Sequence, residues 1–232
     1  MDVSLPWSEG ERQVQALLSV PPTDNPTVPG LPARYVARIS HSSLIVLAAT
    51  DAEGRPWATV WGGERGCATQ LAPGVLGVRS KVSGEDPVLR ALFGGKVMVT
   101  PDEEERGIGG LAMDFLSRDR VKFAGRMMVG AADGGSVRDV QVGIEVRESL
   151  GNCPKYINKR HLVPHDMAPV VEGSGLPLSQ RAVDIIEKAD LLFVASGKGS
   201  MDANHRGGPP GFVRIVKNDE DGVVLAYPEC EW

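Results

Sequence analysis

Short runs of β-branched and other apolar residues, separated by glycine, proline and polar turn residues, make up most of the chain. Residues 43–50 predict a buried strand, 51–54 the turn of a hairpin, and 56–61 the returning strand. Further strand-like runs lie at 75–78, 111–116, 120–131 and 137–146, and the last of them alternates apolar and polar positions. About six strands around one core predict a small β-barrel, and the fold class is therefore β-rich α+β.

Short helices are predicted to flank these strands. Residues 8–20 carry an N-cap at Ser8, a capping-box Glu11 and apolar residues on one face, and two prolines follow them. The same kinds of start and stop signals predict further helices near 33–39, 86–94 and 178–189. The helices are too short to form a layer of their own, so the barrel carries the fold.

The hairpin pattern occurs twice. Residues 43–66 can be laid against residues 190–211, which pairs the two GG-x-x-G clusters with a small gap in the hairpin. Chance similarity between two hairpins is the alternative, because an apolar strand, a turn and a second strand are a common combination. We expect a split-barrel domain over 1–162, a linker over 163–177, and a partial second split-barrel repeat over 178–232.

Composition limits the possible partners. With 232 residues and 42% hydrophobic content the chain can bury a full core, and its three cysteines have no disulfide or zinc spacing. A formal net charge of -5 argues against nucleic acid as a partner. No signal peptide or membrane span is visible. We therefore expect a cytoplasmic protein whose partner is a small molecule, with no nucleic acid and no membrane.

Two segments of the predicted barrel could hold a ligand. On the returning strand, Thr59, Trp61 and Gly62 precede a glycine turn where missing side chains let a ligand approach the backbone. A β-bulge beside a core tryptophan is the alternative. At the end of a later strand, Arg79 and Ser80 offer a cation and a hydroxyl to a phosphate. An ordinary solvated strand end is the alternative there.

Two later segments add further candidates. Lys155 and Tyr156 lie in a stretch that collects positive charge in an otherwise acidic protein, although it could equally be a polar exit loop. His205 and Arg206 precede the second glycine pair and could serve an equivalent site in the repeat, or form a structural pair. No metal-binding, catalytic-triad or paired-carboxylate pattern is present, and the GIGG at 107–110 predicts a turn, because it lacks the Lys-Ser/Thr of a P-loop.

Three sequence segments resemble the pyridoxamine 5'-phosphate oxidase-like family. They are SLGNCPKYI at 149–157, GRPWATVWGG at 54–63 and NHRGGPPGFVRI at 204–215. The resemblance implies a six-stranded split β-barrel that forms a homodimer, with FMN in the groove between subunits. By position, Arg79 and Ser80 match the strand end that holds the phosphate in such barrels, and residues 59–62 match the strand along the cofactor.

The resemblance implies an FMN-dependent oxidoreductase that acts on an unidentified small organic substrate. Vitamin B6 oxidation is not expected, because the full arginine and lysine set of the true oxidases is missing. The alternative is a non-catalytic split-barrel module that binds flavin, haem or a partner subunit. If Arg79 holds the phosphate, Arg79→Ala should weaken FMN binding by roughly 1.5 to 3 kcal/mol, the range of a charge-assisted hydrogen bond.

Overall fold

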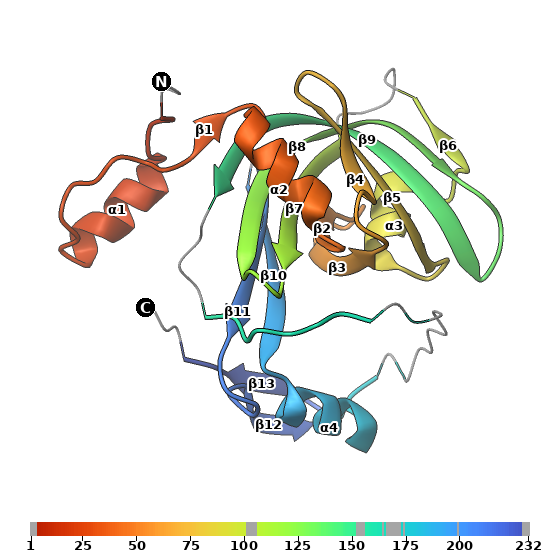
Figure 1. The fold of residues 1–232 in the computed structure, drawn as a ribbon. Coiled ribbons are helices and arrows are strands. Elements are labelled where there is room, and N and C mark those ends of the chain that lie inside the picture. The colour runs from red at the N-terminus through yellow and green to blue at the C-terminus, as the bar shows by residue number, and fades with distance from the viewer. Residues whose placement is uncertain are drawn as a thin grey trace.

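The structure is a computed structural model that describes residues 4–100, 106–151, 156–163, 165, 173, 175–198 and 200–228. It is β-rich, with one large antiparallel sheet, two further two-stranded sheets and four short helices (Figure 1). The helices are α1 (Glu9–Leu17), α2 (Ala33–His41), α3 (Pro87–Phe93) and α4 (Gln180–Lys188). None of the described helices has the length and apolar content needed to cross a bilayer.

The large sheet has the strand order β3-β2-β7-β8-β9-β5-β4. Its strands are β2 (Leu44–Thr50), β3 (Pro56–Gly62), β4 (Ala68–Ala72), β5 (Val75–Ser83), β7 (Arg106–Asp114), β8 (Asp119–Ala132) and β9 (Val137–Gly151). The two-residue strands β1 (Val28–Pro29) and β6 (Met98–Val99) pair with β9 and β8.

The large sheet curls but does not close into a barrel. Strands β3 and β5 come into contact, yet no backbone ladder joins them among the described residues. Across this seam the Ser80 hydroxyl donates a hydrogen bond to the Gly62 carbonyl oxygen at 2.6 Å. An antiparallel sheet rolled around one core with an open seam is consistent with a split β-barrel-like fold.

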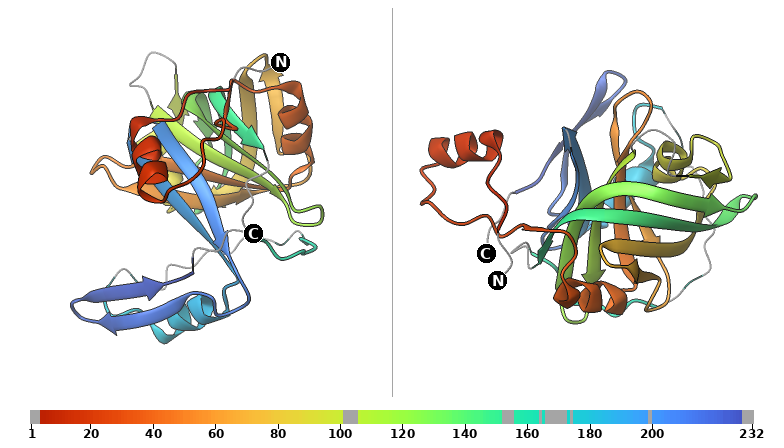
Figure 2. Two further views of the ribbon diagram at one scale, coloured as in Figure 1. Left: turned by 90° about the vertical axis from the view of Figure 1, so that its left-hand side faces the viewer. Right: turned by 90° about the horizontal axis from the view of Figure 1, so that it is seen from above.

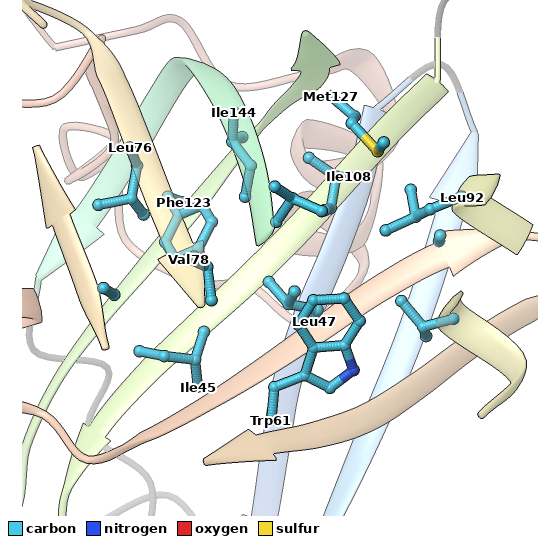
Figure 3. Packing of buried hydrophobic residues seen from close by; sticks show 14 of the residues in the cluster. Ile45, Leu47, Trp61, Leu76, Val78, Leu92, Ile108, Phe123, Met127 and Ile144 are labelled. Atoms are coloured by element: carbon cyan, nitrogen blue, oxygen red, sulfur yellow. The ribbon is translucent and has the colours of Figure 1, made fainter. Parts of the chain in front are cut away.

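The interior of the curled sheet is a single apolar core (Figure 3). Alternate residues of every long strand point into it, as the two-residue repeat of a β-strand requires. Its buried members include Ile45 and Leu47 on β2, Trp61 on β3, Leu76 and Val78 on β5, Ile108 on β7, Phe123 on β8 and Ile144 on β9. Helix α3 adds Leu92 and Phe93, which are fully buried, and so packs tightly against the core.

The local sequence signals for helices are confirmed. Helix α1 begins after Ser8 with the predicted capping box, in which Glu11 N–H donates to Ser8 Oγ and Ser8 N–H donates to the Glu11 carboxylate. Helix α3 has its N-cap at Asp86 and ends at Gly94, whose φ of 56° is left-handed. However, none of the side chains of α1 is buried, and the helix stands away from the barrel (Figure 1).

The prediction of a turn at residues 107–110 is wrong, because they lie inside β7. The glycines make room for side chains and backbone from distant parts of the chain. A Cβ atom on Gly110 would come within 2.0 Å of the Phe123 ring, and one on Gly109 within 2.9 Å of the Met201 carbonyl oxygen. Strand β7 can therefore pack closely on both of its faces.

The C-terminal part repeats the order of elements seen at the start of the barrel. Helix α4 is followed by β10 (Leu191–Lys198), β11 (Ser200–Gly207), β12 (Arg214–Asp219) and β13 (Gly222–Ala226). The β10–β11 hairpin lies along the outside of the curled sheet, where it contacts β2, β3, β7 and β8 (Figure 2). The proposed linker at 163–177 stays a prediction, because most of it lies outside the described residues.

Candidate functional site

An open cavity of about 1320 Å³ lies where three parts of the chain meet. The tip of the β2–β3 hairpin forms one side, helix α3 and the start of β7 form another, and the tip of the β10–β11 hairpin forms the third. Ligand sites commonly occupy about 300 to 1000 Å³, so this cavity has room for a cofactor and a substrate. Both the barrel and the C-terminal repeat line it.

An aromatic wall stands at the hairpin side of the cavity. The Trp57 side chain is 39% exposed, and its Nε1 donates a hydrogen bond to Asp51 Oδ2 at 2.8 Å. Arg55 Nε donates to the same oxygen at 2.8 Å, and the Arg55 guanidinium lies 5.9 Å from the centre of the Trp57 ring. These contacts fix the ring on an exposed hairpin where it would otherwise turn freely.

Asp51 is the group that orients this wall. Partial burial acts to raise the pKa of its carboxyl, but the hydrogen bonds from Trp57 and Arg55 outweigh burial and lower the pKa to about 2. The carboxylate is therefore charged at neutral pH. Since a charged acceptor strengthens both hydrogen bonds, the ring and the arginine are held together across the physiological range.

Two guanidinium groups line the side of the cavity formed by α3 and β7. Arg90 extends from α3 and forms an ion pair with Glu85, and its side chain is 59% exposed. Arg106 lies at the start of β7 and donates to the Leu92 carbonyl oxygen at the end of α3. Guanidinium groups bind phosphate and carboxylate well, so this side of the cavity suits an anion that replaces Glu85, which also lines it, as the partner of Arg90.

The first predicted group, Thr59, Trp61 and Gly62, does not line the cavity. The Trp61 ring is fully buried in the barrel core (Figure 3), and the Gly62 carbonyl oxygen accepts the hydrogen bond from Ser80. Thr59 Oγ1 donates to Asp86 Oδ1 at 3.2 Å. The tryptophan therefore takes the core position that was the alternative at this strand, and the other two residues stabilise the fold around it.

Asp86 caps helix α3 next to the cavity, and burial raises the pKa of its carboxyl. The native state therefore binds the proton more tightly than the unfolded state, and stability should fall as the pH rises through and above the ordinary value of 3.8. Asp86→Asn keeps a good N-cap without the charge, so its unfolding free energy should rise relative to the wild type between pH 4 and pH 7. Urea denaturation at each pH measures this, and a pH-independent difference would contradict it.

Asp86→Ala, which removes the cap, should lower the free energy of unfolding by about 1 kcal/mol.

The second predicted pair, Arg79 and Ser80, points to opposite faces of β5. Ser80 is buried, and its hydroxyl donates the hydrogen bond to the Gly62 carbonyl oxygen across the seam between β3 and β5. Arg79 is 67% exposed at its side chain and lies 3.4 Å from Asp139 of the neighbouring strand. Neither residue lines the cavity. Phosphate binding by Arg79 stays a prediction, and it would require a site on the surface outside this cavity.

The third predicted group gathers at the second glycine pair. Tyr156 Oη donates to Asn158 Oδ1 at 2.8 Å, and Asn158 Nδ2 donates to Asp190 Oδ2 at 2.7 Å and to the Gly208 carbonyl oxygen at 3.3 Å. Two of the sequence segments that carry the family resemblance thus meet here. Lys155 lies outside the described residues.

His205 and Arg206 belong to the same region. The His205 side chain is fully buried between its strand and the barrel, and Arg206 Nη1 donates to the His205 carbonyl oxygen at 2.9 Å. Neither they nor Tyr156 line the cavity. In the described part of the chain, no group of three or more His, Cys, Asp or Glu residues could hold a metal ion.

Trp57, Arg90 and Arg106 are not among the residues that the sequence predicts for a site. A signal for Trp57 was available: residues 57, 59 and 61 alternate onto one face of β3, so Trp61 lies in the core while Trp57 reaches the rim. No comparable signal existed for the two arginines. They line one cavity only in the completed fold, where Arg106 reaches the Leu92 carbonyl oxygen at the end of α3.

No family model and no curated protein matches the chain. Solved structures with partial similarity include a provisionally assigned pyridoxamine 5'-phosphate oxidase from Lactobacillus delbrueckii, with 16% identity, 52% of this chain and 93% of that chain covered, and a TM-score of 0.36. HupZ of Group A Streptococcus has 12% identity, coverage of 52% and 93%, and a TM-score of 0.35. A FAD and haem binding protein from Mycobacterium smegmatis has 11% identity, coverage of 68% and 97%, and a TM-score of 0.35.

Proposed function

We propose that the chain is an FMN-dependent oxidoreductase that binds the flavin in the cavity between the barrel and the β10–β11 hairpin. The observation that carries this proposal is an open cavity lined by an oriented aromatic ring and, on its α3 and β7 side, by Arg90 and Arg106. FMN requires a flat wall for its ring system and cations for its phosphate. When bound, it would supply two-electron chemistry toward a small organic substrate.

Different residues of the cavity would bind different parts of FMN. Trp57, held by Asp51, offers the flat surface on which the isoalloxazine would stack. Arg90 and Arg106 would hold the phosphate, with Arg90 exchanging the exposed Glu85 carboxylate for the more highly charged phosphate.

Arg90→Ala is expected to weaken FMN binding by roughly 1.5 to 3 kcal/mol, about a 10- to 150-fold rise in Kd, because one charge-assisted contact to the phosphate is lost. Quenching of flavin fluorescence on titration with protein measures the Kd. The matched control is Arg79→Ala, which removes another exposed, ion-paired arginine outside the cavity.

Three outcomes of this titration decide where the phosphate binds, or whether FMN binds at all. A loss at Arg90 with unchanged binding at Arg79 supports the cavity. A loss at Arg79 alone would move the phosphate to the end of β5, as the sequence resemblance predicts. A wild-type chain that binds no FMN at micromolar concentration would contradict the proposal in both forms.

Oxidoreductase activity needs a second test on the FMN-loaded chain. Bound flavin that is bleached by NAD(P)H or dithionite and regains its absorbance in air supports a redox enzyme. Retained flavin that cannot be cycled in this way would favour the non-catalytic alternative, a module that binds flavin or haem.

A further inference from the structure

The chain folds the same unit twice. In the first unit Leu44 pairs with Gly62 and Ala48 with Ala58, and in the second Leu191 pairs with Gly207 and Ala195 with Ala203. Both hairpins follow a nine-residue helix and lead into a second, two-stranded hairpin. The registers of β2–β3 and β10–β11 therefore correspond residue by residue.

The glycine turns after the two hairpins agree in detail. Gly63 N–H donates to the Ser43 carbonyl oxygen at 3.1 Å, and Gly208 N–H donates to the Asp190 carbonyl oxygen at 3.1 Å. A Cβ atom on Gly63 would lie 2.6 Å from Cys67 Cβ, and one on Gly208 would lie 2.6 Å from Phe212 Cβ. Chance similarity of two hairpins does not extend to such details, so the sequence repeat is a structural repeat.

The two units meet through the same face. Residues of β2 and β3 that point outward from the barrel share one apolar cluster with their own counterparts on β10 and β11. The corresponding pairs are Leu44 and Leu191, Val46 and Phe193, Ala48 and Ala195, and Ala58 and Ala203. Strand β10 contacts β3 and, reciprocally, β11 contacts β2; β10 also contacts β2, and β11 also lies against β7 and β8 of the barrel. A surface that packs on a copy of itself in this reciprocal way is the mark of an isologous, dimer-type contact.

We infer that the β10–β11 hairpin occupies the place that the β2–β3 hairpin of a second copy of this chain would otherwise fill. The barrel face beneath it is apolar and fully covered: Val46, Ala48, Leu111 and Met113 have no exposed surface. Polar contacts hold the hairpin on it, since Lys122 Nζ lies 2.7 Å from Asp202 Oδ1. If the hairpin were displaced, this apolar face would be exposed, and an exposed apolar face of this kind favours association with another chain.

The same contact completes the cavity. Gly197, Ser200 and Met201 at the hairpin tip line it together with Thr50 and Trp57 of the first hairpin. The resemblance predicts a homodimer with the cofactor between subunits, and the second unit supplies that second wall within one chain. This contact is present whichever ligand the cavity takes, so its test is separate from the test of flavin binding.

The test compares the wild type with three full-length variants by size-exclusion chromatography with light scattering. Phe193→Asp puts a charge into the shared apolar cluster and should displace the hairpin, so that the uncovered faces of two chains pair and the mass doubles relative to the wild type. Val216→Asp, at an exposed apolar position on β12 outside the shared cluster, should keep the wild-type mass. Adding Val46→Asp to Phe193→Asp should return the mass to that of the wild type, because the face itself then carries a charge.

A mass of Phe193→Asp equal to that of the wild type would overturn the inference, and so would a doubled mass that Val46→Asp does not reverse. If circular dichroism finds Phe193→Asp unfolded, Phe193→Ala takes its place over a concentration series. It should shift the chain toward the two-chain mass as concentration rises, and a concentration dependence identical to that of the wild type overturns the inference.

Discussion

Gly125→Ala is expected to lower the free energy of unfolding by roughly 3 kcal/mol or more, at or above the upper end of overpacking costs. Gly125 lies on β8 where the register with β9 shifts. An added Cβ would lie 1.9 Å from the Glu145 carbonyl oxygen and 3.1 Å from Val146 Cα. Both are backbone atoms of the neighbouring strand and cannot swing away, so the two longest strands of the barrel would have to separate.

The matched control is Gly134→Ala, in the turn that joins the same two strands. A Cβ there meets no atom within 4 Å, and its backbone is not left-handed. We expect a change of less than about 0.5 kcal/mol, as for ordinary surface substitutions. Urea unfolding followed by circular dichroism measures both variants. Equal effects at the two positions would mean that the β8–β9 bulge adapts to a side chain.

The elements that sequence analysis found are those whose signals are local. Ser8 with Glu11, and Asp86 with Gly94, mark helix ends by hydrogen bonds within one turn, and alternation in residues 137–146 follows from the pleat of a single strand. The glycines of β7 do not form the predicted turn. They are needed because a side chain there would collide with the Phe123 ring or with the backbone at Met201. Such partners are fixed only by the completed fold.

The candidate site could be predicted less well than the fold, for the same physical reason. Residue type and the family resemblance together gave Arg79 and Ser80 a phosphate role. Strand alternation, however, sends one side chain outward and the other into the seam. The cavity forms from three segments far apart in sequence, among them the hairpin tip at Met201. The repeated GG-x-x-G was the one long-range signal in the sequence, and it located the second unit that builds one wall.

The two tryptophans of β3 should differ strongly in their effect on stability, because one lies in the core and the other lines the cavity. Trp61→Ala should lower the unfolding free energy by roughly 3 to 5 kcal/mol, because the ring is fully buried and its loss leaves a cavity. Trp57→Ala should cost only about 1 kcal/mol, the value of one hydrogen bond, because its ring is partly in solvent. Urea unfolding of both variants measures the difference.

In flavin titration, the substitution at Trp57 should have a larger effect than the substitution at Trp61, the reverse of their effects on stability. Trp57→Ala removes the proposed wall and should raise the Kd for FMN, while Trp61→Phe, which keeps an aromatic ring in the core, should leave the Kd unchanged. The opposite result would place the ligand beside Trp61, on the part of β3 where the sequence predicts a site. Since residues 57 and 61 share one face of one strand, four positions along β3 separate a side chain that stabilises the barrel from one that can meet a ligand.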